Sequence, residues 1–333
     1  MVKKQTIIIL GDGGWGTTLS ILLAKKGYRV CLWGVFKDYV ESLRKKRINS
    51  KFLNGIKIPS EILITSQIEQ ALDYAKTVIL AIPSQYLRSV LRKISRHDLR
   101  GRIFLSATKG IEQKSLKRMS EVVIDELGRV NLAVISGPNI AHEIARGKPA
   151  VSVVASKNKK TADFFQDLLI NKNFRVYTNE DVIGIELGGS LKNIIALACG
   201  ISDGLNLGTN AKAALLTRGL VEISRLGVAM GARRETFYGV SGLGDLVTTC
   251  TSLYSRNRFV GEQIARGKRL KDIKNKMQMV AEGISTTKAA YGLSKRHKVE
   301  MPITKEIYHV LYKNKSAKKA VSDLMKRAKK PEH

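Results

Sequence analysis

Short apolar runs alternate with amphipathic stretches along the first half of the chain. The apolar runs predict β-strands over residues 6–10, 28–33, 77–82, 103–107, 132–136 and 150–155. Apolar side chains that recur every three to four positions predict helices over residues 17–26, 84–94 and 115–126. Strands that alternate with helices in this way are typical of βαβ units and of a mostly parallel sheet.

The pattern changes near residue 180, after which strand-like runs become scarce. Apolar positions at helical spacing then predict helices over residues 187–201, 211–230, 256–266, 285–295 and 317–328. We therefore expect an α/β domain over residues 1–180 and an all-helical domain over residues 181–333. The length of 333 residues supports this division, because a typical domain has roughly 150 residues.

A glycine-rich segment joins the first predicted strand to the first predicted helix. Gly11, Gly13 and Gly16 fit the pattern G-x-G-x-x-G. In that pattern the first glycine permits a tight turn, the second lets the backbone approach a pyrophosphate, and the third lets the helix pack close to the strand. The helix N-terminus adds free N–H groups and a positive dipole. We predict a Rossmann-type dinucleotide site, with an ordinary glycine-rich turn as the simpler alternative.

The corner after the second predicted strand bears on the choice of dinucleotide. An acid about 20 residues after the glycines usually binds the ribose 2′-hydroxyl of NAD. Here the segment Trp33-Gly-Val-Phe-Lys contains no acid, and the next one is Asp38. The missing carboxylate removes a repulsion against a 2′-phosphate, and Lys37 could attract one. The corner therefore slightly favours NADP(H).

The composition is that of a globular protein with a strongly basic surface. Lys and Arg number 58 against 28 Asp and Glu, which gives a net charge of +30. The basic residues are scattered and lack interleaved aromatic side chains, so we expect a solvated basic surface rather than a dedicated nucleic-acid site. No uninterrupted apolar stretch approaches the roughly 20 residues of a membrane span. Three widely separated cysteines indicate reduced thiols and a cytoplasmic protein.

A lysine stands among small residues on one predicted helix of the second half. Small residues lie three, four or seven positions from Lys192, which is helical spacing along one face: Gly188, Gly189, Ala196 and Cys199. Such a stripe could form a groove that admits a ligand. It could equally serve close helix packing, with Lys192 extending to water.

Two further segments carry groups suited to an anion. The segment Ser241-Gly-Leu-Gly-Asp is followed by Ser255, Arg256 and Asn257, which together offer hydroxyls, an amide and an arginine fork for a phosphate. The same segment could be a capping loop with a structural arginine. Lys109 directly follows a predicted strand, at the edge of the sheet where ligands bind. The histidines form no metal-binding pair, so we expect no metal site.

Taken together, these segments resemble the bacterial NAD(P)-dependent glycerol-3-phosphate dehydrogenases over nearly the whole chain. The most specific stretches are Ser136-Gly-Pro-Asn-Ile-Ala-His-Glu, Leu187-Gly-Gly-Ser-Leu-Lys-Asn, Leu215-Leu-Thr-Arg-Gly-Leu and Gly242-Leu-Gly-Asp-Leu with Ser255-Arg-Asn. The resemblance implies reversible reduction of dihydroxyacetone phosphate to sn-glycerol 3-phosphate with NAD(P)H, in support of phospholipid synthesis. It also implies a homodimer.

The resemblance further implies roles for individual residues. Lys192 matches the proton donor and acceptor of the family. Matches to substrate contacts are Lys109, Gly137, Asn139, Lys192, Asp245, Ser255, Arg256 and Asn257. Matches to cofactor contacts, beside the motif residues Gly11, Gly13 and Gly16, are Gly14, Trp15, Ala141, Val280 and Glu282, with Lys109 and Arg256 expected to touch both ligands.

Three positions depart from the family pattern. Asn139 stands where Ser or Thr is frequent, and Gly14 stands where Ser is common, which leaves only the backbone to bind. Val35 replaces a basic residue that often meets the 2′-phosphate, which weakens the preference for NADP.

Three other functions fit parts of the sequence. A β-hydroxyacid or ketopantoate-type dehydrogenase shares the domain plan and a lysine on the same helix, but binds a carboxylate. A nucleic-acid-binding protein could retain the dinucleotide fold. A cofactor sensor without catalysis would be expected to have lost Lys192 or Asp245, and both are present.

Overall fold

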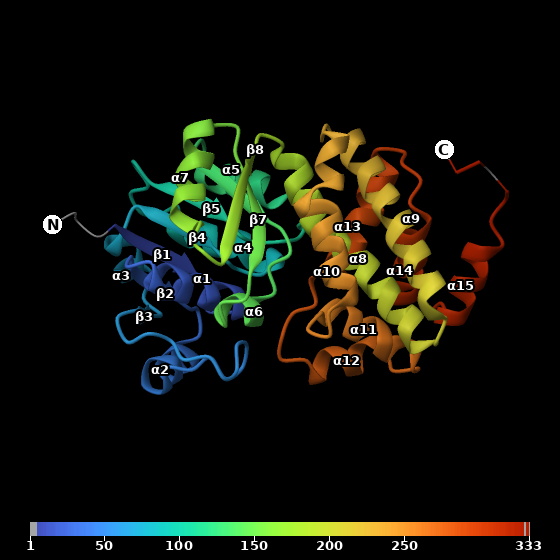
Figure 1. Ribbon diagram of the computed structural model, residues 1–333, viewed down its shortest axis with the longest axis horizontal. Helices are drawn as coiled ribbons and strands as arrows, with labels where there is room; N and C mark the ends of the chain where they lie inside the picture. The colour runs from blue at the N-terminus through green and yellow to red at the C-terminus, as the bar shows by residue number, and fades with distance from the viewer. Residues whose placement is uncertain (1–4, 330, 333) are drawn as a thin grey trace.

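The computed structural model describes residues 5–329 and 331–332 of the chain. A sheet-containing half and a helical half lie side by side (Figure 1). The first half contains one eight-stranded sheet with the strand order β3-β2-β1-β4-β5-β6-β7-β8. Its strands are β1 (Thr6–Leu10), β2 (Arg29–Trp33), β3 (Leu63–Thr65), β4 (Thr77–Leu80), β5 (Ile103–Ser106), β6 (Asn131–Ser136), β7 (Ala150–Ala155) and β8 (Phe174–Asn179).

The strand order places a ligand crevice at the carboxyl ends of β1 and β4. All neighbouring strands are parallel except β6 and β7, which pair antiparallel. From β1 the chain builds the sheet in one direction through β2 and β3, and in the other direction from β4 onward. Connections that diverge in this way leave a crevice at the carboxyl edge, where dinucleotides bind.

Helices cover both faces of the sheet, because successive strand residues point to opposite sides. Ile7 and Ile9 of β1 pack in one apolar cluster, whereas Ile8 and Leu10 pack in the other. Helices of the first cluster are α1 (Gly14–Lys25), α2 (Lys37–Lys46), α6 (Ala141–Ala145) and α7 (Lys159–Leu169). Helices of the second cluster are α3 (Ile68–Tyr74), α4 (Ser84–Ile94) and α5 (Met119–Leu127).

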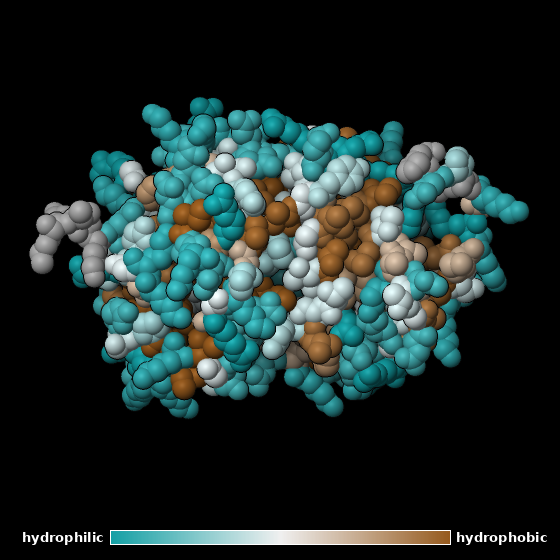
Figure 2. Space-filling view, in the orientation of Figure 1, coloured by the Kyte–Doolittle hydropathy of each residue, from teal (hydrophilic) through white to brown (hydrophobic). Residues whose placement is uncertain are grey.

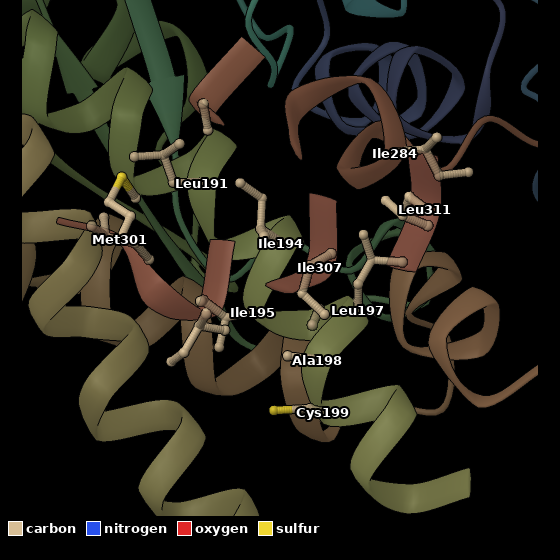
Figure 3. Close-up of a cluster of buried hydrophobic side chains, with 14 of the residues drawn as sticks. Leu191, Ile194, Ile195, Leu197, Ala198, Cys199, Ile284, Met301, Ile307 and Leu311 are labelled. Atoms are coloured by element: carbon tan, nitrogen blue, oxygen red, sulfur yellow. The ribbon is translucent and has the colours of Figure 1, made fainter. Parts of the chain in front are cut away.

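The helical half is built around one long buried helix, α8 (Val182–Gly204). Its apolar side chains pack against residues such as Ile284, Met301, Ile307 and Leu311 (Figure 3). The surrounding helices are α9 (Gly208–Ala229), α10 (Asp245–Thr251), α11 (Arg256–Ala265), α12 (Leu270–Lys276), α13 (Glu282–Arg296), α14 (Pro302–Tyr312) and α15 (Ala317–Met325). A 3₁₀ turn over Arg234–Tyr238 and a π-helical turn over Val240–Gly244 precede α10.

These elements confirm the predicted fold class, an α/β sheet half followed by a helical half, and correct several details. The strands β3 and β8 were not expected from the apolar pattern, since β3 has only three residues and β8 alternates buried and exposed positions. The helix predicted over residues 115–126 begins only at Met119. Leu116 has a φ of 62°, a left-handed conformation that cannot belong to an α-helix. The last helix ends at Met325 rather than at residue 328.

Helix α8 is the one helix, among the residues that the structure describes, with the length and hydropathy of a membrane span. However, 89% of its apolar window is buried inside the protein. This burial identifies it as the core helix of the helical half. On the face shown in Figure 2, hydrophilic residues predominate, and hydrophobic residues gather over part of the helical half.

Glycines let other segments approach α8 at backbone distance. A Cβ on Gly200 would lie 1.9 Å from the carbonyl oxygen of Arg258, near the start of α11. We expect Gly200→Ala to lower the free energy of unfolding by about 1–3 kcal/mol, because the clash outweighs the gain in helix propensity. Denaturant unfolding of both proteins measures this difference.

The matched control is Ser202→Ala on the same helix. The Ser202 hydroxyl is buried and has no hydrogen-bond partner among the described residues. Removing it should change the unfolding free energy by less than about 0.5 kcal/mol. Equal stabilities of the Gly200→Ala variant and the parent would show that α11 can move away from α8 at little cost.

Candidate active site

A single carboxylate, that of Asp245, lies between two lysines from different halves of the protein. Asp245 is the first residue of α10 and is fully buried. Lys192 comes from the middle of α8, and its Nζ donates to Oδ1 of Asp245. Lys109 follows β5, and its Nζ lies 2.7 Å from Oδ2 of the same carboxylate. With both amines protonated, this lysine–aspartate cluster carries a net positive charge.

The surroundings of Lys192 decide between the two interpretations of its glycine stripe. The glycines serve close packing, since a Cβ on Gly188 would lie 2.8 Å from the carbonyl oxygen of Ser241, and one on Gly189 would lie 2.2 Å from Oγ of Ser136. Lys192 itself is only 6% exposed, so it does not extend to water. Its Nζ also donates to Oγ1 of Thr249, at 2.5 Å. The small residues thus let an amine be held in a buried position.

Lys109 links the cluster to the loop that follows β6. Its Nζ donates to the carbonyl oxygen of Gly137 at 3.0 Å and to Oδ1 of Asn139 at 2.7 Å. Gly137 has a φ of 145°, and a Cβ there would meet the backbone of Ser152 at 2.8 Å. The Nδ2 of Asn139 is buried and has no partner among the described residues. This amide is a donor that remains available to a ligand.

The protonation of Lys109 is set by its position in the cluster. Burial lowers the pKa of Lys109 to about 7, and the positive charge of Lys192 adds to the effect. The carboxylate of Asp245 acts in the opposite direction, because it stabilises the ammonium. Lys109 therefore loses its charge as the pH rises through neutrality.

The glycine-rich segment has the shape that a dinucleotide pyrophosphate requires. Gly11 has a φ of 121°, and a Cβ there would lie 2.3 Å from the carbonyl oxygen of Ala81. A Cβ on Gly16 would lie 1.8 Å from the carbonyl oxygen of Gly11, whereas one on Gly13 would have no atom within 4 Å. Gly13 caps α1, whose first N–H groups have no intrahelical partner. These residues fit NAD(P), with the open side of Gly13 facing the space for the phosphates.

Two of the other expected cofactor contacts, Trp15 and Ala141, lie in or beside this segment. The Cβ of Ala141 lies 3.8 Å from the position that a Cβ on Gly14 would take. Trp15 is partly buried, and its Nε1 has no partner among the described residues. Val280, which is 40% exposed, lies just before α13 on the helical half.

Glu282 connects the helical half to the carboxyl edge of the sheet. Its Oε1 accepts from the backbone N–H of Ser84 at 2.9 Å, and its Oε2 accepts from the Ser84 hydroxyl at 2.5 Å. Ser84 is the first residue of α4, shortly after β4. Burial raises the pKa of Glu282, and the positive charge of Arg256 acts in the opposite direction because it stabilises the carboxylate. The first turn of α13 is thus held beside the crevice, with an arginine next to it.

The start of α11 joins the cluster through an amide pair. The Nδ2 of Asn257 donates to Oδ1 of Asn193, the neighbour of Lys192, at 2.8 Å. The Oδ1 of Asn257 accepts from the N–H of Gly283 at 2.9 Å. Ser255 caps α11 by accepting from the N–H of Arg258, and Arg256 is exposed. The helix N-terminus, with its positive dipole, and the Arg256 guanidinium are groups that can bind an anion. They lie on a helix that contacts the helix of Lys192.

The structure therefore brings the expected substrate residues into two neighbouring groups. Lys109, Gly137, Asn139, Lys192 and Asp245 are joined by direct hydrogen bonds, and Ser255, Arg256 and Asn257 open α11. Sequence reasoning did not assign roles to Thr249 or Ser84. The available signal for Thr249 was its position four residues after Asp245, one helical turn along the same face.

Family models match both halves of the chain. One described as NAD-dependent glycerol-3-phosphate dehydrogenase N-terminus matches residues 6–162, and one described as the C-terminus of that enzyme matches residues 181–322. The chain belongs to the NAD-dependent glycerol-3-phosphate dehydrogenase family. The resemblance found in the sequence is thereby confirmed. Members of this family are NAD(P)-dependent enzymes with an NAD-binding N-terminal domain.

Bacterial relatives align with nearly the whole chain. A glycerol-3-phosphate dehydrogenase (NAD(P)+) of Chlorobium limicola is 46% identical over 329 residues, which is 98% of this chain and 99% of the relative. That of Thermoanaerobacter sp. is 48% identical over 326 residues, which is 98% of each chain. The crystal structure of a glycerol-3-phosphate dehydrogenase from Coxiella burnetii superposes with a TM-score of 0.94 at 38% identity, covering 97% of this chain and 99% of that one.

The ketopantoate-type alternative shares only the fold with this family member. A ketopantoate reductase from Ralstonia eutropha JMP134 has a TM-score of 0.62 at 13% identity, covering 95% of this chain and 100% of that one. Within the described part of the chain, no group of three His, Cys, Asp or Glu side chains is arranged to hold a metal ion.

The lowered pKa of Lys109 predicts a pH dependence. We expect kcat/KM for dihydroxyacetone phosphate to fall as the pH rises above about 7, because neutral Lys109 no longer attracts the anionic substrate. In Lys109→Arg the charge persists to high pH, so this fall should disappear or move upward. Steady-state pH profiles of both proteins measure the effect.

The control is Lys114→Arg, a change at an exposed lysine of the same loop. Its pH profile should match that of the parent. If Lys109→Arg also retains the fall near neutrality, the titrating group is a different one.

Proposed function

We propose that the enzyme reversibly reduces dihydroxyacetone phosphate to sn-glycerol 3-phosphate with NAD(P)H, and that Lys192 is its general acid and base. The observation that carries the proposal is the buried ion pair of Lys192 with Asp245, beside Lys109 and close to the dinucleotide crevice. The names of the bacterial relatives support the same reaction. Glycerol 3-phosphate made in this way would supply phospholipid synthesis.

The chemistry at Lys192 follows from the charge that develops on the substrate. A nicotinamide cofactor, when bound in the crevice, would supply the hydride for the ketone carbon. Negative charge then grows on the ketone oxygen, and the Lys192 ammonium stabilises that charge and donates a proton to it. Asp245 and Thr249 hold Nζ in one position, so the amine is oriented before the substrate arrives. In the reverse direction the neutral amine accepts the proton of the hydroxyl.

Lys109 and Asn139 complete the substrate side of the crevice. Lys109 places a second positive charge beside the Asp245 carboxylate, and the net positive charge favours an anionic ligand. The unpartnered Nδ2 of Asn139 offers one hydrogen bond to the substrate. The Nζ of Lys109 also donates to both Asn139 and Asp245. A substrate that contacts Asn139 or Lys109 would therefore also hold Asp245 in position.

The start of α11 is suited to the phosphate group. Arg256 offers a guanidinium fork, and the first N–H groups of the helix add donors and dipole. Nδ2 and Oδ1 of Asn257 each have a partner within the protein, so this residue positions α11 against α8 and α13. The second N–H of Nδ2 is left for the substrate. A phosphate held there fixes the ketone relative to Lys192. The homodimer and the cytoplasmic location stay predictions from the sequence.

Removal of the Lys192 amine tests its catalytic role. We expect Lys192→Ala to lower kcat by about 10²–10⁴, while the Kd for NADH changes by less than about threefold. Stopped-flow turnover and NADH fluorescence titration measure the two quantities. Lys192→Met keeps the apolar part of the side chain but lacks the amine. Its kcat should fall as much as that of Lys192→Ala if the fall reflects the missing proton donor rather than a disturbed structure.

The control for this pair is Lys288→Ala, which removes an exposed lysine of the helical half. Its kcat should equal that of the parent. A Lys192→Met variant with near-normal kcat would refute the assignment of the proton donor.

Arg256→Ala tests the phosphate site. We expect KM for dihydroxyacetone phosphate to rise by about tenfold or more, since a charge-assisted bidentate contact is lost. Turnover of dihydroxyacetone, which lacks the phosphate, should be affected much less. Arg225→Ala, at an exposed arginine of α9, is the matched control. An equal effect on both ketones would place Arg256 away from the phosphate.

A further inference from the structure

The half-buried side chain of Asp12 has no role in the site described so far. Asp12 lies between Gly11 and Gly13 in the glycine-rich segment. Its Oδ2 is buried and has no hydrogen-bond partner among the described residues. A buried carboxylate oxygen without a donor is costly, which indicates that its donor arrives with a ligand.

Ordinary structural roles do not account for this side chain. Helix α1 is capped by Gly13 without any side-chain hydrogen bond, and no acid lies in its first turn. The contacts that hold Asp12 use its backbone carbonyl instead, which accepts from Nδ2 of Asn49 at 2.8 Å and from Oγ1 of Thr17 at 3.4 Å. The backbone is thus fixed by buried partners. Its own backbone N–H acts on the carboxylate as a donor, while Oδ2 has no partner among the described residues.

The carboxylate occupies the space next to the end of β2. Gly34 directly follows β2, and a Cβ built on it would lie 2.1 Å from Oδ2 of Asp12 and 2.5 Å from its Cγ. An acid near this corner is what usually binds the adenosine ribose in dinucleotide folds. In this chain the corner carries Gly34 and Val35, and the acid enters the same space from the glycine-rich segment.

Two side chains next to this corner are exposed to solvent. Phe36 is 70% exposed and Val35 is 46% exposed. The Lys51 ammonium is near enough for its positive charge to stabilise the Asp12 carboxylate. The Nζ of Lys51 lies 5.1 Å from the ring centroid of Phe52. Burial raises the pKa of Asp12 to about 6, while Lys51 lowers it, so the carboxylate is ionised at pH 7.5.

We propose that Asp12 replaces the missing acid at the end of β2, accepts a hydrogen bond from the adenosine 2′-hydroxyl of NAD, and makes this enzyme prefer NAD over NADP. The inference rests on the proposed function, since it concerns the same cofactor. A 2′-phosphate would face the ionised carboxylate at close range and leave it without a donor. We expect this repulsion to exceed the attraction between Lys37 and a phosphate, because Lys37 is exposed to solvent whereas Asp12 is half-buried.

The test measures binding of the reduced cofactors in the absence of substrate. Fluorescence titration at pH 7.5 gives Kd for NADH, NADPH and 2′-deoxy-NADH, the analogue without the adenosine hydroxyl. We expect the parent to bind NADH about tenfold or more tightly than either analogue. In Asp12→Asn the ratio of NADPH to NADH Kd should fall by about tenfold, because repulsion of the phosphate is removed.

The deoxy analogue separates a direct contact from a general change of the loop. Removal of the adenosine 2′-hydroxyl should weaken cofactor binding strongly in the parent and much less in Asp12→Ala. The losses of binding free energy from the analogue and from the substitution should therefore not be additive. Asp38→Asn, at the exposed acid on α2, is the matched control and should leave all three Kd values unchanged. Thermal unfolding of each variant shows that it is folded.

Each outcome bears on a distinct claim. A parent that prefers NADPH, or an Asp12→Asn variant with an unchanged Kd ratio, would overturn the role of Asp12 and leave the proposed reaction intact. A parent that binds none of the three nucleotides and does not reduce dihydroxyacetone phosphate would instead refute the proposed function. Additive effects of the hydroxyl and of Asp12→Ala would also overturn the direct contact.

Discussion

The structure depends on one carboxylate that is shared by two lysines. Asp245 is buried at the start of α10, where it binds Lys192 of the helical half and Lys109 of the sheet half. A buried charge without a partner would be strongly destabilising, so each of the three groups requires the others. The same ion cluster therefore joins the two halves and holds the amine that we propose as the proton donor. The stability of the interface and the orientation of the Lys192 amine have one physical origin.

Close backbone packing makes this cluster possible. Gly188 and Gly189 bring α8 against the turn before α10 and against β6, and Gly200 brings it against α11. With larger residues at these positions, α8 could not hold Lys192 within reach of Asp245 while Asn193 contacts Asn257. The glycines cost helix propensity, but they allow a core helix to carry a lysine at its centre.

Much of the sheet half was predictable because its signals are local. The apolar run of β1, the glycines and the helix after them occupy consecutive residues, and their spacing specifies the turn. The strand β8 was missed although its buried and exposed positions alternate with period two, since polar residues interrupt the apolar run. The late start of α5 depends on the left-handed backbone of Leu116, which no apolar pattern reveals.

The sequence by itself determined the dinucleotide fold and the family, and it predicted the two lysines as site residues, because these follow from motifs of neighbouring residues. Only the tertiary structure decided which charges meet. Asp245 is 53 residues from Lys192 and 136 residues from Lys109, so their pairing depends on how α8, α10 and β5 pack. Likewise, the corner after β2 lacks an acid in the sequence, yet Asp12 fills that space in the folded protein. Side chains distant along the chain became partners because the glycines allow the backbones to approach.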